Sequence, residues 1–129
     1  MNISVEEQLE AYTTWKTREL LAKYSITTDQ YGLSTSDGRD VRKLWTFTYE
    51  QLVQHLQAHP ERADSYLTNS QKMKGVYDRD ILEHERGRYV LYWQDHGKRR
   101  NERFYGDLFH AAADWLTVQY GMWLHEHDA

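Results

Sequence analysis

Two glutamates separated by one residue are the first side chains that could do chemistry. Glu83 and Glu85 flank His84, and the segment 81–85 (ILEHE) reads as a short strand. On a strand the two carboxylates share one face and the imidazole takes the other. Paired carboxylates can act as general acid and base, so a small enzyme using Glu83, Glu85 and a histidine is one alternative. No nucleophile or phosphate-binding loop accompanies them, and an exposed acidic strand that resists aggregation is the stronger interpretation.

Two histidines four residues apart form the second chemical pair. On a helix the imidazoles of His55 and His59 face the same way, a spacing that zinc accepts. The intervening Leu-Gln-Ala lacks the glutamate of a metalloprotease helix, and the sequence shows no evident third ligand. The final letters HEHDA add His125 and His127, which suit the negative end of a helix dipole. We therefore expect no metal, no cofactor and no catalytic residue.

A basic segment beside aromatic residues is the third candidate. Residues 96–103 contain the letters KRR, and four aromatic residues flank them: Tyr92, Trp93, Phe104 and Tyr105. Because basic side chains bind phosphates and aromatic rings stack on bases, a small nucleic-acid-binding module using hairpin 96–103 is a further alternative. The pI of about 5.9 argues against it, since dedicated nucleic-acid domains have values above about 9.

Composition predicts one domain, residues 1–129, with a core of its own. Apolar residues make up 40% of the chain and aromatic residues 14%, too many for a disordered segment. There is no cysteine, so disulfides and thiolate chemistry are excluded. The polar first residues do not resemble a signal peptide, and no apolar run approaches the roughly 20 residues that span a bilayer. We expect a cytoplasmic protein without a membrane partner.

The net charge of −4 is unevenly distributed. Residues 86–103 hold six basic and two acidic side chains, whereas residues 104–129 hold four acids and neither lysine nor arginine. A polar charge distribution favours a charged macromolecular partner over a small neutral ligand. A solvated hairpin tip would explain the basic segment equally well.

Capping signals and periodicity predict the elements of the N-terminal half. Ser4 and Glu7 form a capping box ahead of a helix over about residues 5–23. Alternating residues around the turn at 36–38 predict a hairpin with strands near 31–35 and 41–47. A second capping box, Thr48 with Gln51, begins another helix, and Pro60 either ends it or opens a new turn. Residues 60–78 fit a short helix or a loop.

The C-terminal half predicts more strands and a final helix. A short strand at 81–85 precedes a hairpin in which 89–93 alternate, the chain breaks at His96-Gly97, and the second strand resumes near Glu102. Asp107 then caps a helix with an apolar face. The predicted fold class is α+β, with a mainly antiparallel sheet of four to five strands in two hairpins, covered by two to three helices.

The segment 88–116 carries a resemblance to a known family. Its parts are an aromatic strand at 89–93, a basic Gly-containing turn at 96–100, Arg103-Phe104, and an acid-capped helix from Asp107 to Leu116. In this pattern it resembles the C-terminal part of immunity proteins from bacterial polymorphic-toxin and contact-dependent growth inhibition systems. The resemblance covers about a quarter of the chain.

The resemblance implies a function without catalysis. Proteins of this kind bind a cognate toxin domain in the cytoplasm and cover or distort its active site. Toxin domains are often basic nucleases, which an acidic surface would attract, although the basic hairpin departs from a uniformly acidic inhibitor. We expect the contact residues to be exposed acids and an aromatic residue near the sheet: Glu83, Glu85, Tyr92 and Asp95. The toxin, the contact face and the oligomeric state stay open.

Overall fold

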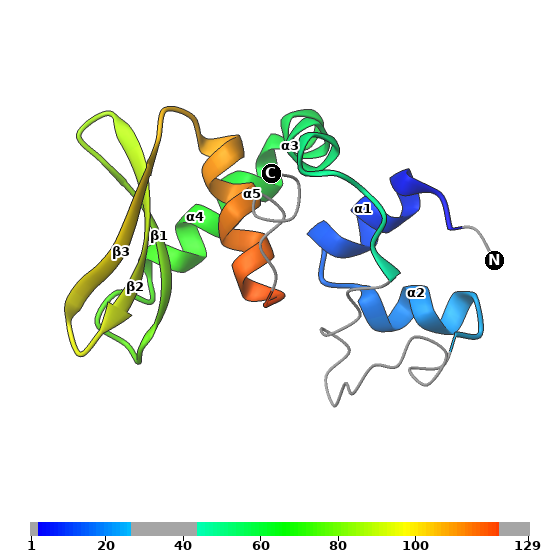
Figure 1. Ribbon diagram of the computed structural model, residues 1–129, viewed down its shortest axis with the longest axis horizontal. Helices are drawn as coiled ribbons and strands as arrows, with labels where there is room; N and C mark the ends of the chain where they lie inside the picture. Colours follow the sequence, from blue (N-terminus) through cyan, green and yellow to red (C-terminus); the bar gives the residue numbers. More distant parts are fainter. Residues whose placement is uncertain (1–2, 27–43, 122–129) are drawn as a thin grey trace.

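The computed structural model describes residues 3–26 and 44–121. These residues form an α+β fold in the order α1, α2, α3, α4, β1, β2, β3, α5 (Figure 1). The fold class is confirmed. Within the described residues the sheet has three strands, fewer than the four to five expected, and five helices replace the expected two to three. The elements are α1 Val5–Thr13, α2 Thr17–Lys23, α3 Tyr49–Ala58, α4 Pro60–Gln71, β1 Arg79–Glu85, β2 Arg88–Asp95, β3 Lys98–Tyr105 and α5 Leu108–Gln119.

Two tight hairpins build the antiparallel sheet, in the order β1-β2-β3. Each hairpin has a two-residue loop with positive φ at both positions: 53° and 79° at Arg86 and Gly87, and 51° and 81° at His96 and Gly97. Such loops match the twist of the paired strands, and glycine at the second position adopts this conformation without strain. The break predicted at His96-Gly97 is therefore confirmed. A β-bulge interrupts the β2–β3 ladder, with Asn101 at φ 57°.

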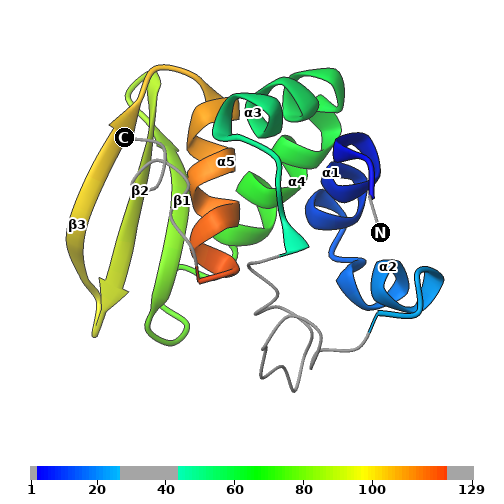
Figure 2. The same ribbon diagram turned by 45° about the vertical axis from the view of Figure 1, so that its right-hand side comes forward.

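The helices cover one face of this sheet. α5 lies against the strands, and α1 and α2 lie on the side of the helical layer that is away from the sheet (Figures 1 and 2). Leu82 and Leu91, paired across β1 and β2, face the helices and are buried. The opposite face carries a small cluster of its own, formed by Ile81, Val90 and Tyr92. None of the helices in the described residues covers this opposite face, which we call the helix-free face (Figures 1 and 2). None of the described helices has the length and apolar character needed to cross a membrane.

The predicted helix over 5–23 is wrong in one respect, because it is two helices. The chain leaves α1 through Trp15, which has φ 60°, and the Lys16 amide donates to the Ala11 carbonyl at 2.8 Å. This bond closes the helix end as a Schellman motif. The hydroxyl of Thr14 also bonds a carbonyl of the preceding turn, that of Glu10, at 2.6 Å. Such bonds compete with helix continuation.

The helix starts follow the capping signals only partly. The Glu7 amide donates to Ser4 Oγ at 3.2 Å, but the Glu7 carboxylate pairs with Lys23 and Tyr24 instead of returning to Ser4. The capping box of Thr48 and Gln51 is complete, with bonds of 3.2 and 2.9 Å. Asp107 caps α5 by accepting from the amide of His110 at 3.0 Å.

Two segments of the middle of the chain differ from the prediction. Residues 60–71, which fitted a short helix or a loop, form the twelve-residue α4 with Pro60 at its first position. The predicted hairpin over 31–47 lies largely outside the described residues. Its described part, residues 44–47, contains no strand. The Thr46 backbone amide donates to Gln8 Oε1 at 2.8 Å, so α1 satisfies a donor that a sheet would have taken.

An aromatic cluster joins the first helix to the last. The rings of Tyr12 and Tyr120 stack with centroids 4.0 Å apart, and the Tyr120 hydroxyl donates to the Tyr12 carbonyl at 2.6 Å. Trp15 stacks on the other side of Tyr120 at 4.9 Å. The contact closes the fold across 108 positions of sequence.

Candidate functional site

Three of the four predicted contact residues meet on the helix-free face. Glu83 lies opposite Val90 and Glu85 lies opposite Arg88, so their carboxylates share the face that Tyr92 also occupies, and His84 takes the other face as predicted. The Tyr92 hydroxyl donates to Glu83 Oε2 at 2.9 Å. Tyr92 itself is only 3% exposed. It orients Glu83 more than it offers surface to a partner.

Arg99 connects these residues into one charged network. Its guanidinium lies 4.3 Å from the centre of the Tyr92 ring and donates to both oxygens of Glu85, at 2.9 and 3.1 Å. It also reaches Glu102 at 3.0 Å. The hydrogen bonds from Arg99 lower the pKa of Glu85. A carboxylate held in this way is a fixed anion and a poor proton donor at neutral pH, so the geometry does not favour acid–base chemistry at this pair.

Asp95, the fourth predicted residue, lies apart from the other three. It stands at the β2–β3 turn, where it accepts from Arg100 Nε at 2.5 Å and lies 2.8 Å from Nδ1 of His96. The hydrogen bond with His96 and then that from Arg100 lower the pKa of Asp95, and the same contact raises the pKa of His96. Arg99 and Arg100 are thus both ion-paired, which weakens the positive field that a nucleic-acid interface would need.

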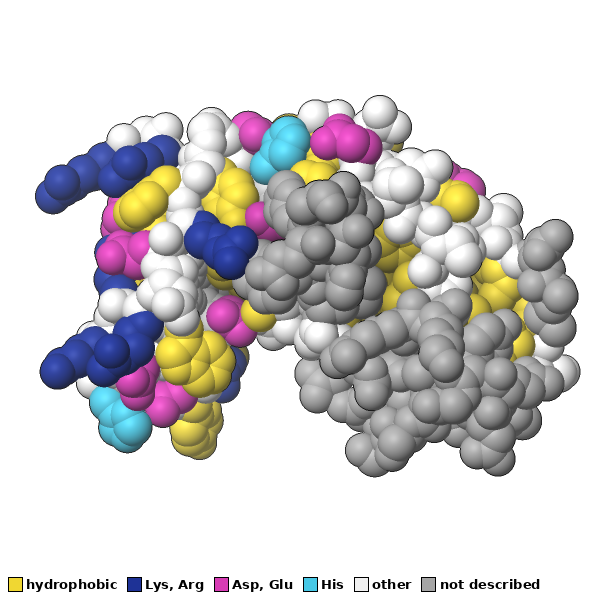
Figure 3. Space-filling model, viewed as in Figure 1, with side chains coloured by type: hydrophobic (Ala, Val, Ile, Leu, Met, Phe, Trp, Pro, Cys, Tyr) yellow, Lys and Arg dark blue, Asp and Glu magenta, His cyan; other side chains and the backbone are white. Residues whose placement is uncertain are grey.

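Exposed aromatic side chains mark the same region of the molecule; the sequence analysis named Trp93 and Phe104 beside the basic hairpin but did not single out Tyr77. The described residues include six large exposed hydrophobic side chains, and five belong to the sheet or to the loop that enters it: Met73, Val76, Tyr77, Trp93 and Phe104. The Arg88 guanidinium lies 3.9 Å from the centre of the Phe104 ring. Hydrophobic and basic side chains alternate on the sheet side of the space-filling view, at the left of Figure 3. Arg88, Arg99 and Phe104 lie on the helix-free face. Trp93, opposite Asp80, lies on the helix side of the sheet, and Tyr77 lies in the loop before β1. We call these five residues, which span both faces of the sheet, the aromatic–arginine surface.

A cleft of about 460 Å³ adjoins this surface on the helix side of the sheet. Asp80, Trp93, Arg103 and Val118 are among the residues that line it. Burial raises the pKa of Asp80 to about 6. The β-bulge at Asn101 shapes one wall, as bulges often do beside binding sites. Neither Asp80 nor the bulge has a signal in the sequence that would have identified it.

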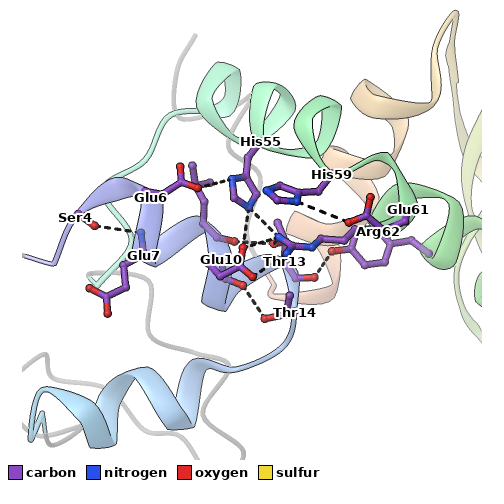
Figure 4. A network of polar contacts seen from close by, with 12 residues as sticks. Ser4, Glu6, Glu7, Glu10, Thr13, Thr14, His55, His59, Glu61 and Arg62 are labelled. Atoms are coloured by element: carbon purple, nitrogen blue, oxygen red, sulfur yellow. Dashed lines mark hydrogen bonds and ion pairs between the residues drawn. The ribbon is translucent and has the colours of Figure 1, made fainter.

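A second polar site lies on the other side of the helical layer, around a buried histidine (Figure 4). His55 projects from the last turn of α3 toward α1 and is 5% exposed. Its Nδ1 lies 3.6 Å from Glu6, and its Nε2 lies 3.5 Å from Glu10 and 2.9 Å from Arg62. His59 follows at the end of α3, with its ring centroid 4.6 Å from that of His55.

The partners of His55 determine its protonation. Arginine can only donate, so Nε2 of His55 accepts from Arg62 and the proton resides on Nδ1. Burial lowers the pKa of His55, which keeps the ring neutral. Arg62 also makes two bonds to Glu10, at 2.7 and 2.8 Å, and these lower the pKa of the Glu10 carboxyl. The predicted pair of histidines therefore lies within a network of acids that the sequence interpretation did not connect to it.

Comparisons with known proteins add no assignment to either site. No protein-family model matches the chain, and neither the characterised proteins nor the solved structures searched include a significant match.

Proposed function

We propose that this protein is an immunity-type inhibitor that binds a cognate toxin domain through the aromatic–arginine surface. The observation that carries the proposal is the concentration of exposed large hydrophobic side chains on the sheet and its entry loop. Aromatic residues and arginine are enriched in protein–protein interfaces. The resemblance of the segment 88–116 to immunity proteins supports the same function.

The fixed charges beside the aromatic residues suit a protein partner better than an RNA. Arg99 is tied to Glu85 and Glu102, and its guanidinium covers the ring of Tyr92. A base could not stack on Tyr92 without displacing Arg99. Alternating fixed charges instead set the orientation of a folded partner and exclude wrong ones. Glu83, Glu85 and Asp95 are the acids that would meet cations of the toxin.

Co-expression tests the proposal. Production of this protein should protect cells against the toxin encoded immediately upstream of its gene, and the two purified proteins should form a complex. A toxin that still kills and does not bind would remove the proposal. A salt-dependent affinity for generic single-stranded RNA, measured at low and high ionic strength, would favour the nucleic-acid alternative instead.

Two substitutions test the surface itself. Phe104→Asp and Trp93→Ala should each weaken the complex about tenfold or more. This corresponds to a loss of about 1.4 kcal/mol of binding free energy, as expected for an energetically important interface residue. Gln57→Asp, on an exposed position of α3, is the control and should bind as the natural protein does. Circular dichroism would establish that all three variants fold. Unchanged affinity of both sheet variants would place the interface elsewhere.

A further inference from the structure

Glu6, His55 and His59 bring three metal-ligating side chains to one place. One ligand atom from each lies within 4.8 Å of the other two. Glu6 belongs to the first turn of α1, His55 belongs to the last turn of α3, and His59 is the C-cap residue of α3. We propose that these residues bind one divalent transition-metal ion of the zinc type. The site lies on the opposite side of the helical layer from the sheet, so it is independent of the proposed interface (Figures 1 and 4).

The separation of the first two ligands fits a shared ion. Nδ1 of His55 and Oε1 of Glu6 lie 3.6 Å apart, which is too long for a good hydrogen bond. Two ligands at about 2.0–2.2 Å from a tetrahedral zinc ion lie about 3.4 Å apart, so little movement is needed. All three side chains line a hollow of about 370 Å³ between α1 and α3. The hollow leaves room for a fourth ligand such as water.

The surroundings of His55 suit a metal ligand, at the cost of one contact. The metal would take the Nδ1 lone pair of a neutral ring, so the proton would move to Nε2. There it would face the Glu10 carboxylate, whose Oε2 is 3.5 Å away. A carboxylate behind a ligating imidazole is the usual outer-shell arrangement of zinc sites. Arg62 would give up its contact with Nε2 and keep its two bonds to Glu10.

The ligand types select the class of ion. Two imidazoles and one carboxylate suit zinc, cobalt or nickel, whereas magnesium and calcium prefer sites made entirely of oxygen. A second group of acids and a histidine, Asp78, Asp95 and His96, is a weaker candidate. Its histidine side chain is 85% exposed, and Arg100 already occupies Asp95.

Titration calorimetry with Zn²⁺ alone tests the site. His125 and His127 lie outside the described residues and could bind metal by themselves, so the background is the full-length chain with His125→Gln and His127→Gln. This background should bind one equivalent of Zn²⁺. Glu6→Gln and His59→Gln in the background should each weaken binding more than about tenfold, the minimum seen even for outer-shell partners. Both side chains are at least one-third exposed, so the core is spared.

Matched variants separate this site from the alternatives. His96→Gln in the same background should bind Zn²⁺ unchanged, because that histidine belongs to the other group. Co²⁺ should produce intense visible absorption bands in the background protein, as tetrahedral coordination requires, and lose them in His59→Gln. Loss of Zn²⁺ binding on removal of the tail histidines or of His96 would overturn the proposal. So would a Zn²⁺ affinity of Glu6→Gln and His59→Gln equal to that of the background protein.

Discussion

Asp80 lies in surroundings that disfavour the charged form of its carboxyl group. It lines the cleft beside Trp93, and burial raises its pKa from 3.8 to about 6. Its pKa is therefore higher in the folded than in the unfolded protein. Between the two values the folded state binds more protons, so stability falls as the pH rises from about 4 to about 6. Above pH 6 the carboxylate is ionised, and its burial in the cleft lowers the free energy of unfolding.

Asp80→Asn should remove this cost. The amide is neutral at every pH, so we expect the free energy of unfolding at pH 7.5 to rise by about 1 kcal/mol, a value reduced for the partial exposure of the group to water. At pH 5 the gain should shrink. Urea unfolding followed by tryptophan fluorescence at both values measures it. Asp64→Asn, at an exposed acid of α4, is the control for the loss of a carboxylate, and a change in the stability of Asp80→Asn that is equal at the two pH values would contradict the assignment.

Among the elements, α1 ends in a way that its sequence does not announce. Trp15 occupies the left-handed position that usually takes glycine, at φ 60°. That conformation costs an ordinary residue about 1–2 kcal/mol. The stacking of Trp15 on Tyr120 and its edge contact with Trp115 offset the cost, since aromatic pairs contribute about 0.5–1.5 kcal/mol each beyond burial. The helix end is thus determined by tertiary contacts.

Substitution of Trp15 separates these contributions. Trp15→Ala should destabilise the protein because it loses the aromatic contacts and still pays for the positive φ. Trp15→Gly loses the same contacts without that strain, so it should be more stable than Trp15→Ala by about 1 kcal/mol. Thermal and urea unfolding of the two variants gives the difference. An alanine variant as stable as the glycine variant would mean that α1 does not end as described.

For the whole molecule, the contact of Tyr12 with Tyr120 joins residues 108 positions apart in the sequence. The Tyr12 carbonyl lies in the last turn of α1, where intrahelical donors run out, and the Tyr120 hydroxyl supplies one at 2.6 Å. Tyr120 is 3% exposed, so water cannot replace the hydroxyl easily. The first helices and the remainder of the fold therefore share one core.

Tyr120→Phe should lower the free energy of unfolding by about 1–3 kcal/mol, the cost of a buried acceptor that loses its donor. Tyr77→Phe removes a hydroxyl from a residue that is 78% exposed, and it should change the free energy of unfolding by less than about 0.5 kcal/mol. Chemical denaturation of both variants measures the difference. If Tyr120→Phe matched Tyr77→Phe, the closure would contribute nothing to stability.

The sequence was sufficient for elements whose signals are local. The alternation of residues 89–93, the His96-Gly97 turn and the Asp107 cap all depend on neighbouring residues, and each has its predicted place. The start of α1 was only half predicted, because Lys23 and Tyr24 compete for the Glu7 carboxylate. The two helices in place of one, and the helix α4, depend on contacts between distant segments that periodicity cannot show.

In the candidate sites, too, local sequence predicts some features, and others depend on contacts between distant segments. The shared face of Glu83 and Glu85 followed from strand geometry alone, but their pairing with Arg99 and Lys74 required the folded sheet. The burial of His55 depends on α1 packing against α3. One signal was available: Glu6 and Glu10 are four residues apart on one helix, and His55 and His59 are four apart on another. Matching pairs of acids and histidines at helical spacing can indicate facing helices.

The stacking of Tyr120 on Tyr12 also bears on how the protein is made. During synthesis Tyr12 is translated before its aromatic partners: Trp45 and Phe47 follow first, and Tyr120, whose ring stacks on it, follows 108 residues later. Until then the apolar side of α1, including Leu9 and Tyr12, is only partly covered. The nascent chain therefore carries an incompletely covered aromatic surface until Tyr120 is added, and a chaperone that binds aromatic segments would find it there.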